Sequence, residues 1–132
     1  MPTTDVQRLN LNWRTRSLPE DRFIFRGLAK GLIESPVKIR PHVADIESMN
    51  TSALKGSVAV TRASFGAVPL LKDNYKILRV GNIIVQGSGP VLVARSDRPL
   101  RFEDIGNALI AIPGELTTAF MICAGKLRRE YV

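Results

Sequence analysis

A short apolar run, a Pro-Gly turn and a candidate helix start follow one another between residues 109 and 121. Residues 109–112 are apolar and include two isoleucines, which is typical of a buried strand. Pro113-Gly114 predicts a turn. The hydroxyls of Thr117 and Thr118 can cap the free N–H groups of a first helical turn. Such a unit can bind an anion at the helix N-terminus, although an ordinary strand-to-helix connection shows the same pattern.

Strand-like and helix-like segments alternate along the rest of the chain. Strands are expected at residues 9–13, 37–39 (extending towards Val43), 57–61, 76–80, 83–85, 91–94 and 109–112. Gly81-Asn82 predicts a hairpin turn between the two strands that flank it. Helices are expected from Pro19 to Gly31, between Asp45 and Gly56, briefly at Pro69, at residues 102–105, and from Thr118 to Tyr131. This alternation predicts an α/β fold with a mixed sheet flanked by helices.

Length and charge bound the class of protein. At 132 residues the chain is one domain by size, or part of a larger one. Its net charge of +7 is compatible with nucleic acid or with acidic small molecules. Basic residues are not interleaved with aromatic residues, so a nucleic-acid partner is not favoured. No apolar run suits a membrane span and the first residues do not resemble a secretory signal, so we expect a cytoplasmic protein without a membrane partner.

Several familiar motifs are incomplete. Gly87-Ser88-Gly89-Pro90 lacks the Gly-Lys-Ser/Thr of a phosphate loop. His42 is the single histidine and has no ligand partner at a suitable spacing, and Cys123 is the single cysteine. We therefore predict no metal site and no cofactor.

Two turns between a strand and a helix are more informative as a pair. Arg62-Ala63-Ser64 follows one predicted strand, and Thr118-Ala119 opens the last helix. Ligands of open α/β sheets bind beyond the carboxyl ends of strands. If the two turns converge, their hydroxyls, backbone N–H groups and one cation would suit a small carboxylated ligand.

Four stretches of the chain form an ordered series. They are Pro19-Glu20-Asp21-Arg22-Phe23-Ile24-Phe25, Asp45-Ile46-Glu47-Ser48-Met49-Asn50 with Ala53-Leu54-Lys55-Gly56, Thr61-Arg62-Ala63-Ser64-Phe65, and Gly87-Ser88-Gly89-Pro90-Val91-Leu92-Val93-Ala94-Arg95 running on to Ile112-Pro113-Gly114-Glu115-Leu116-Thr117-Thr118-Ala119. In order and spacing they resemble the 1,4-dihydroxy-6-naphthoate synthases of the futalosine pathway of menaquinone biosynthesis. The resemblance runs from about residue 9 to residue 121, and the series is more specific than any one motif.

The resemblance implies a fold similar to type II periplasmic binding proteins, with a ligand cleft between two α/β lobes. Residues 1–95 would belong to the first lobe, and residues 96–132 to a hinge connection and the start of the second. The implied reaction is the lyase step that converts cyclic dehypoxanthine futalosine to 1,4-dihydroxy-6-naphthoate. By position, the substrate-binding residues would be Arg62, Ala63, Ser64, Thr118 and Ala119.

The chain departs from the family pattern at three places. The family's Ser-Pro-Cys-Pro-Asn-Asp-Thr turn reads Arg-Ser-Leu-Pro-Glu-Asp-Arg here, at residues 16–22, and Arg62 replaces a lysine. The family's general-base histidine would lie beyond Val132, so no catalytic residue is assigned. A homo-oligomer or a partner that supplies the second lobe stays open. A non-catalytic solute-binding protein and a chorismate dehydratase relative are the alternative functions.

Overall fold

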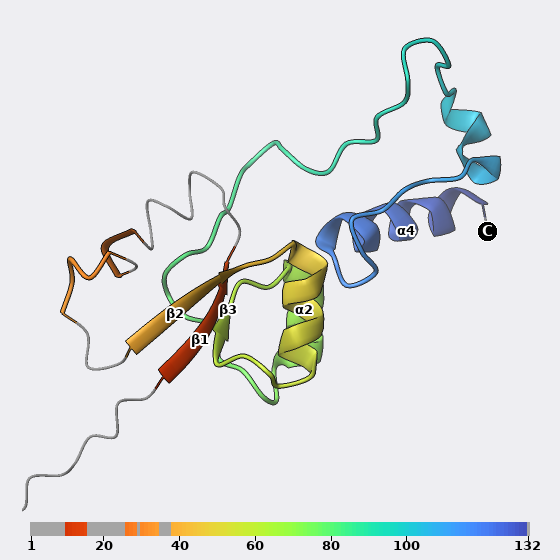
Figure 1. The fold of residues 1–132 in the computed structure, drawn as a ribbon. Helices are drawn as coiled ribbons and strands as arrows, with labels where there is room; N and C mark the ends of the chain where they lie inside the picture. Colours follow the sequence, from red (N-terminus) through yellow and green to blue (C-terminus); the bar gives the residue numbers. More distant parts are fainter. Residues whose placement is uncertain (1–9, 16–25, 29, 35–37, 132) are drawn as a thin grey trace, which may run out of the picture.

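A computed structural model describes residues 10–15, 26–28, 30–34 and 38–131 (Figure 1). The helix start expected at Pro19 lies outside the described residues. Gly31 has a φ of +66° after the helical residues 26–28, as expected for the end of a helix. The elements are β1 (Asn10–Thr15), β2 (Lys38–Val43), α2 (Ile46–Leu54), β3 (Val60–Thr61), the 3₁₀ turn η1 (Phe65–Ala67), α3 (Val68–Leu71), the 3₁₀ helix η2 (Phe102–Asn107) and α4 (Thr118–Tyr131).

The described strands form one parallel sheet in the order β2-β1-β3. The pairing of β1 with β2 runs from Asn10 opposite Lys38 to Thr15 opposite Val43, whereas β1 meets β3 only at Trp13 and Arg14. The first two strands therefore lie where the alternating apolar pattern predicts them. The third strand is shorter than the predicted residues 57–61. Parallel pairing agrees with strands that are connected through helices; the likeness to a two-lobed binding-protein fold stays a prediction.

Helix α2 begins and ends at the residues that the sequence indicates. Asp45 is its N-cap, and its Oδ1 accepts a hydrogen bond of 2.8 Å from the backbone N–H of Ser48. Gly56 follows the helix with a φ of +64°, a conformation that glycine adopts without a steric penalty. Pro69 sits in the first turn of the four-residue helix α3, which is as short as the proline predicts.

The core is small and lies around α2. Met49 and Ala53 of α2 are fully buried, and Ala53 forms a cluster with Ala67 and Leu71. Tyr75 and Leu116 pack against this cluster. Leu54, which the helical spacing assigned to the same apolar face, is 41% exposed instead. The core therefore joins α2, η1 and α3 to the turn before α4.

Four of the predicted strands are wrong. Residues 76–80, 83–85, 91–94 and 109–112 form no strand, and the hairpin expected at Gly81-Asn82 is absent from the described chain. All of their apolar side chains except that of Ile110 are exposed, with Val91 exposed by 81%, Val93 by 88% and Leu109 completely. A strand needs a neighbour that pairs with its N–H and C=O groups, and among the described residues no strand pairs with these segments.

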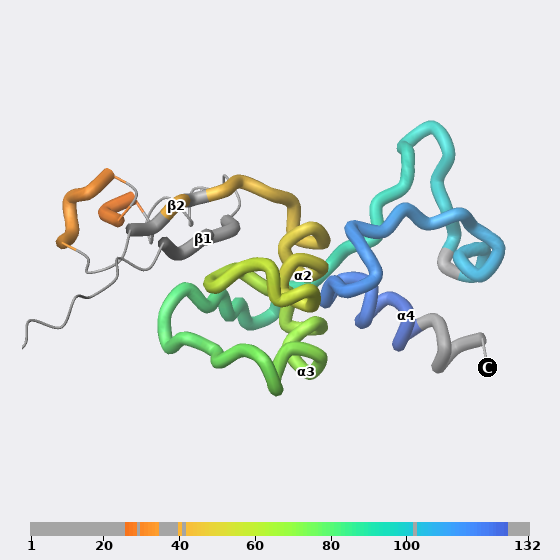
Figure 2. The backbone as a smooth tube through the Cα atoms, turned by 60° about the horizontal axis from the view of Figure 1, so that its bottom comes forward, coloured from red at the N-terminus to blue at the C-terminus, as the bar shows by residue number. Residues whose placement is uncertain are grey.

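The chain instead leaves the sheet as an extended connection and returns. In Figures 1 and 2 the teal segment runs away from the three strands to η2, and the following blue segment comes back to the start of α4 beside α2. The helical turn expected at residues 102–105 is confirmed by η2, and the last helix by α4. The return brings the opening residues of α4 against η1 and α2.

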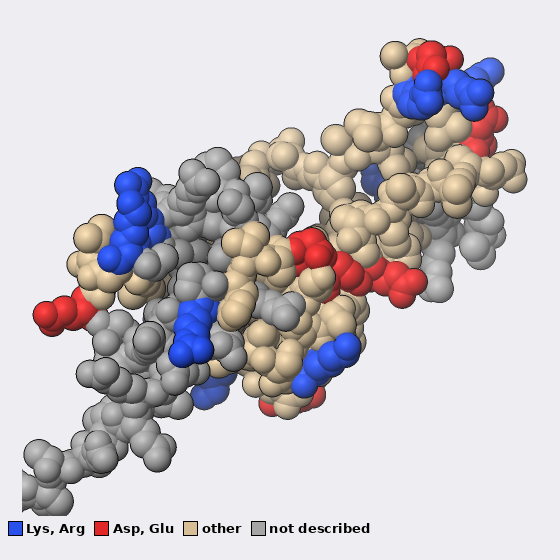
Figure 3. All heavy atoms as spheres, in the orientation of Figure 1, with Lys and Arg blue, Asp and Glu red and all other residues tan. Residues whose placement is uncertain are grey.

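The charged residues do not form one continuous patch on the face that Figure 3 shows. Lys and Arg side chains fall into separate groups there, with acidic side chains among them. Within the described ranges, no helix is long and apolar enough to cross a membrane.

Candidate functional site

The first predicted turn is held by a buried amide on α2. The backbone N–H of Ser64 donates to Asn50 Oδ1 over 2.9 Å, and Asn50 Nδ2 donates to Ser64 Oγ over 3.2 Å. Asn50 is fully buried. The Asn50 side chain therefore fixes both the backbone and the hydroxyl of Ser64. These bonds also satisfy the polar groups of Asn50, as a buried amide requires.

The second predicted turn is built by two threonines with different tasks. Thr117 Oγ1 accepts a hydrogen bond of 3.2 Å from the N–H of Phe120, so Thr117 caps α4 as the sequence suggests. Thr118 Oγ1 accepts one of 2.9 Å from the N–H of Gly66, in the 3₁₀ turn that follows Ser64. The second bond ties the start of α4 directly to the first turn.

Leu116 provides a second connection between the two turns. Its carbonyl accepts a hydrogen bond of 3.3 Å from Asn50 Nδ2, the same group that contacts Ser64. Its N–H lies 3.1 and 3.3 Å from the two carboxylate oxygens of Glu47. The two turns thus meet, a condition that the sequence left open, and α2 supplies the side chains that join them.

The converging groups leave several hydrogen-bond donors uncommitted. Ser64 and Thr118 each accept one bond through the hydroxyl oxygen and keep the hydroxyl proton as a donor. Within the described residues, the backbone N–H groups of Thr118 and Ala119 at the start of α4 have no partner. Donors of this kind near a helix N-terminus suit a carboxylate.

Not every predicted site residue takes part in these contacts. Arg62 is half-buried and its carbonyl accepts a hydrogen bond of 3.0 Å from Thr61 Oγ1. Ala63 is exposed and Ala119 is half-buried. The hydrogen bonds described above fix the side chains of Ser64 and Thr118. The substrate-binding role of all five residues stays a prediction.

Comparison with known proteins gives a matching family model and two similar curated relatives. The model of a family described as menaquinone biosynthesis matches residues 16–130, which is most of the chain. The chain belongs to this menaquinone biosynthesis family. A 1,4-dihydroxy-6-naphthoate synthase of Thermus thermophilus is 38% identical over 104 residues, which are 79% of this chain and 37% of that relative. A second synthase of this name, from Streptomyces coelicolor, is 30% identical over 104 residues, which are 79% of this chain and 36% of the relative.

The chain spans little more than a third of the length of these curated relatives. The matched family region, residues 16–130, contains both converging turns and the helix α2 that joins them. The residues that form the candidate site therefore all lie within the part of the chain that matches the family model.

One carboxyl near the site has a shifted pKa. The Ser48 hydroxyl donates to Asp45 Oδ2 over 2.5 Å, and this bond, followed by that from the Ser48 backbone N–H, lowers the pKa of Asp45 below its usual value. The lowered pKa keeps Asp45 ionised as the N-cap of α2. Far from the site, the Arg95 guanidinium lowers the pKa of Asp97 in an exposed ion pair.

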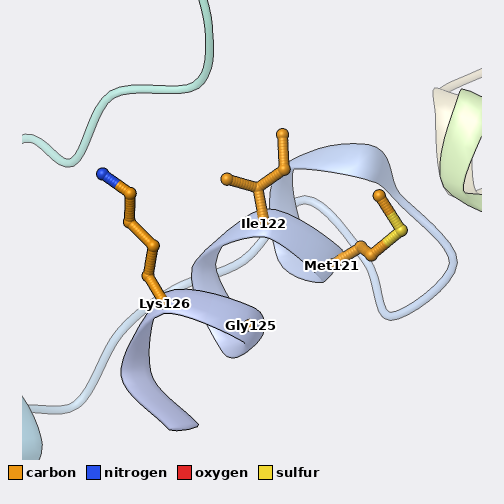
Figure 4. Close-up of a pocket in the computed structure, with 4 residues that line it drawn as sticks. All are labelled: Met121, Ile122, Gly125 and Lys126. Carbon is orange, nitrogen blue, oxygen red and sulfur yellow. The ribbon is translucent and has the colours of Figure 1, made fainter. Parts of the chain in front are cut away.

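The hollow on the surface of α4 is not the candidate site. It is lined by Met121, Ile122, Gly125 and Lys126, which lie on one face of the helix (Figure 4). Met121 and Ile122 are about half exposed there. In the described part of the chain, no three histidine, cysteine or acidic residues are grouped as metal ligands would be.

Sequence reasoning assigned no role to Glu47 and Asn50. A signal was present, because Asn50 follows Ile46 by four positions and precedes Ala53 by three, and thus interrupts the apolar face of a predicted helix. A polar residue within such a face indicates a buried hydrogen-bonded group. Its partners, Ser64 and Leu116, could not be found from spacing, since they lie 14 and 66 positions away.

Proposed function

We propose that this chain supplies substrate-binding turns for a lyase step of menaquinone biosynthesis, the formation of 1,4-dihydroxy-6-naphthoate from cyclic dehypoxanthine futalosine. The observation that carries the proposal is the junction of the Ser64 turn with the start of α4 through Asn50 and through the Gly66–Thr118 hydrogen bond. The names of the two relatives, both synthases of this naphthoate, support the choice of reaction.

The chemistry of the ligand matches the donors at the junction. A naphthoate carries a carboxylate, which accepts hydrogen bonds and never donates them. The hydroxyl protons of Ser64 and Thr118 and the N–H groups of Thr118 and Ala119 are donors. Arg62 adds a positive charge to the first turn. The side chains of Ala63 and Ala119 are small and leave room for a ring to approach the backbone.

No proton-abstracting residue is assigned within the described turns. Ser64 and Thr118 are hydroxyls already fixed by hydrogen bonds, and they serve to orient the ligand. The lyase step needs a general base, so in this proposal the turns bind and orient while the base comes from another group.

Calorimetric titration with 1,4-dihydroxy-6-naphthoate tests the binding role. We expect binding by the wild-type chain and none for 1,4-dihydroxynaphthalene, which lacks the carboxylate. Ser64→Ala removes one donor to a charged group and should weaken binding about tenfold or more. Ser88→Ala, an exposed serine in the extended connection, is the matched control and should bind as wild type. Equal affinity for the two naphthalenes would refute a carboxylate site at these turns.

A non-catalytic solute-binding role is the second candidate. The hydrogen-bond donors of the described turns support it, because they would bind a ligand without requiring a base. Incubation with cyclic dehypoxanthine futalosine distinguishes the two functions. Release of the naphthoate supports the lyase, whereas tight binding of the substrate without product supports the binding protein.

A further inference from the structure

A carboxylate on α2 reaches the turn that precedes α4. Glu47 lies in the first turn of α2, is half-buried, and accepts the N–H of Leu116, which is 69 positions away in the chain. The two carboxylate oxygens lie 3.1 and 3.3 Å from this nitrogen. A hydrogen bond to a carboxylate is charge-assisted and stronger than one between neutral groups.

The backbone of the turn is shaped to admit this carboxylate. Gly114 has a φ of +147°, which side-chain-bearing residues rarely adopt. A Cβ atom at this position would lie 2.5 Å from Glu47 Cγ and closer still to the carboxyl group. Such an atom would overlap the carboxyl group that bonds Leu116, so the Glu47 side chain would have to shift. Gly114 and Glu47 are therefore fitted to one another.

The carboxylate also contacts the amide that holds the other turn. Asn50 Nδ2 lies 3.5 Å from Glu47 Oε2 and 3.3 Å from the carbonyl of Leu116. The N–H of Leu116 is thus bound by one α2 side chain and its C=O by another. Thr118 lies two residues further on, and its hydroxyl oxygen accepts a hydrogen bond from the N–H of Gly66.

We propose that Glu47 is a positioning residue that fixes the turn before α4 and thereby places Thr118 and Ala119 for the ligand carboxylate. The proposal rests on the proposed function for the identity of that ligand. Glu47 acts through Leu116 and contacts no ligand itself. Its carboxylate satisfies a backbone donor next to the helix N-terminus, so the donors left for the ligand are those of Thr118 and Ala119.

Amide hydrogen exchange separates positioning from general stability. The exchange rate of the Leu116 amide reports the hydrogen bond to Glu47 directly. The exchange rate of the Gly66 amide reports whether the Thr118 hydroxyl keeps its position. In Glu47→Ala we expect both amides to exchange about tenfold faster or more. Amides inside α2, such as that of Ala53, should keep their wild-type rates.

Three further variants make the test specific. Glu47→Gln keeps an acceptor oxygen and should restore protection at Leu116 to within about threefold of wild type, since a neutral bond replaces a charge-assisted one. Glu115→Ala removes an exposed carboxylate from the same turn without breaking the contact, and should leave both amides unchanged. Gly114→Ala should speed exchange in the wild-type background, and by a smaller factor when Glu47 is already alanine, because the overlap is then gone.

Affinity for 1,4-dihydroxy-6-naphthoate completes the experiment. We expect Glu47→Ala to weaken binding about fivefold or more and Glu47→Gln to recover most of the loss. The positioning role is overturned if Gly66 keeps its protection in Glu47→Ala, or if exchange rises equally throughout α2. If the wild-type chain binds no naphthoate, the proposed function fails, while the exchange at Leu116 and Gly66 still decides whether Glu47 fixes the turn.

Discussion

Replacing Asn50 by aspartate should make the stability of the chain depend on pH in a defined direction. Asn50 is fully buried, donates to Leu116 O, Glu47 Oε2 and Ser64 Oγ, and accepts the N–H of Ser64. Asn50→Asp keeps the shape and the acceptor but removes the donor. An ionised oxygen would then face the carbonyl of Leu116 and the carboxylate of Glu47, both acceptors, where Asn50 now donates over 3.3 and 3.5 Å.

The size of the loss follows from those contacts. A buried acceptor that loses its donor costs about 1–3 kcal/mol, and Leu116 is only half-buried. Glu47 Oε2 keeps the N–H of Leu116 as a donor over 3.3 Å. The Ser64 hydroxyl can rotate and donate to the new carboxylate, so that contact changes little. The loss at the Leu116 carbonyl is therefore about 1–2 kcal/mol, with a further penalty for the buried charge near neutral pH.

The sign of the pH effect comes from the folded-state pKa of the introduced carboxyl. Burial and the nearby Glu47 carboxylate both raise that pKa above the value of about 3.9 in the unfolded chain. The penalty for the buried charge is therefore absent below about pH 4 and grows as the pH rises towards the folded-state pKa. Asn50→Ala introduces no titrating group, so its deficit relative to wild type should not change over the same range.

Urea unfolding followed by circular dichroism at several pH values between about 4.5 and 7.5 measures these differences. The deficit of Asn50→Asp should be larger at the neutral end of this range, while that of Asn50→Ala stays constant. Asn82→Asp makes the same chemical change at an exposed side chain and serves as the control, with no expected pH trend. A deficit for Asn50→Asp that is small at neutral pH, or that grows as the pH falls, would refute the buried donor role of Asn50.

Two further variants test the junction and the cap of α2. Gly66→Ala places a Cβ atom 3.2 Å from the backbone of Thr118, which cannot rotate away as a side chain could. We therefore expect the free energy of unfolding, measured by thermal unfolding, to fall by about 1–3 kcal/mol. Gly89→Ala is the control and should cost far less, because its Cβ atom meets open space. Asp45→Ala should lower the melting temperature near neutral pH, and this difference should shrink in acid. The reason is that the hydrogen bonds from Ser48 lower the pKa of Asp45 in the folded chain. Such a carboxyl stabilises the fold above about pH 4, and this stabilisation is lost as the pH falls through the folded-state pKa. A difference between Asp45→Ala and wild type that grew in acid would contradict the cap.

The local parts of the fold could be predicted because their signals are local. Helix α2 is specified by Asp45 at one end, by Gly56 at the other and by the apolar spacing between them. The cap of α4 at Thr117 is likewise a contact within three positions of the chain. Each of these features depends on neighbours in the sequence, so the sequence pattern contains the information.

The predicted strands at residues 76–94 and 109–112 failed for the opposite reason. Their apolar and β-branched residues satisfy the pattern of a strand, but the pattern does not state which backbone would pair with it. In the described structure Ile84 is 92% exposed and Val93 is 88% exposed. The two-lobed fold implied by the family resemblance stays a prediction for the same reason, since the chain covers little more than a third of its curated relatives.

The candidate site was half predictable. The turn at Ser64 and the helix start near Thr118 follow from the sequence pattern, although residues 109–112 before the second turn form no strand. The bond between Gly66 and Thr118 shows that the two turns meet, which the sequence left open. The side chains that enforce it, Glu47 and Asn50, act over distances of 14 to 69 positions. Only the buried amide left a trace in the sequence, as a polar residue within an apolar helical face.

The position of Glu47 and Asn50 on α2 couples the site to the core. Met49 and Ala53 form the buried apolar stripe of this nine-residue helix, and Glu47 and Asn50, three positions apart, form the neighbouring polar stripe. Rotation or fraying of α2 would therefore displace the core contacts and the Leu116 turn together. Variants that loosen the core should weaken ligand binding through this helix, whereas variants in the connection should leave binding intact, since the side chains of residues 82–101 are exposed.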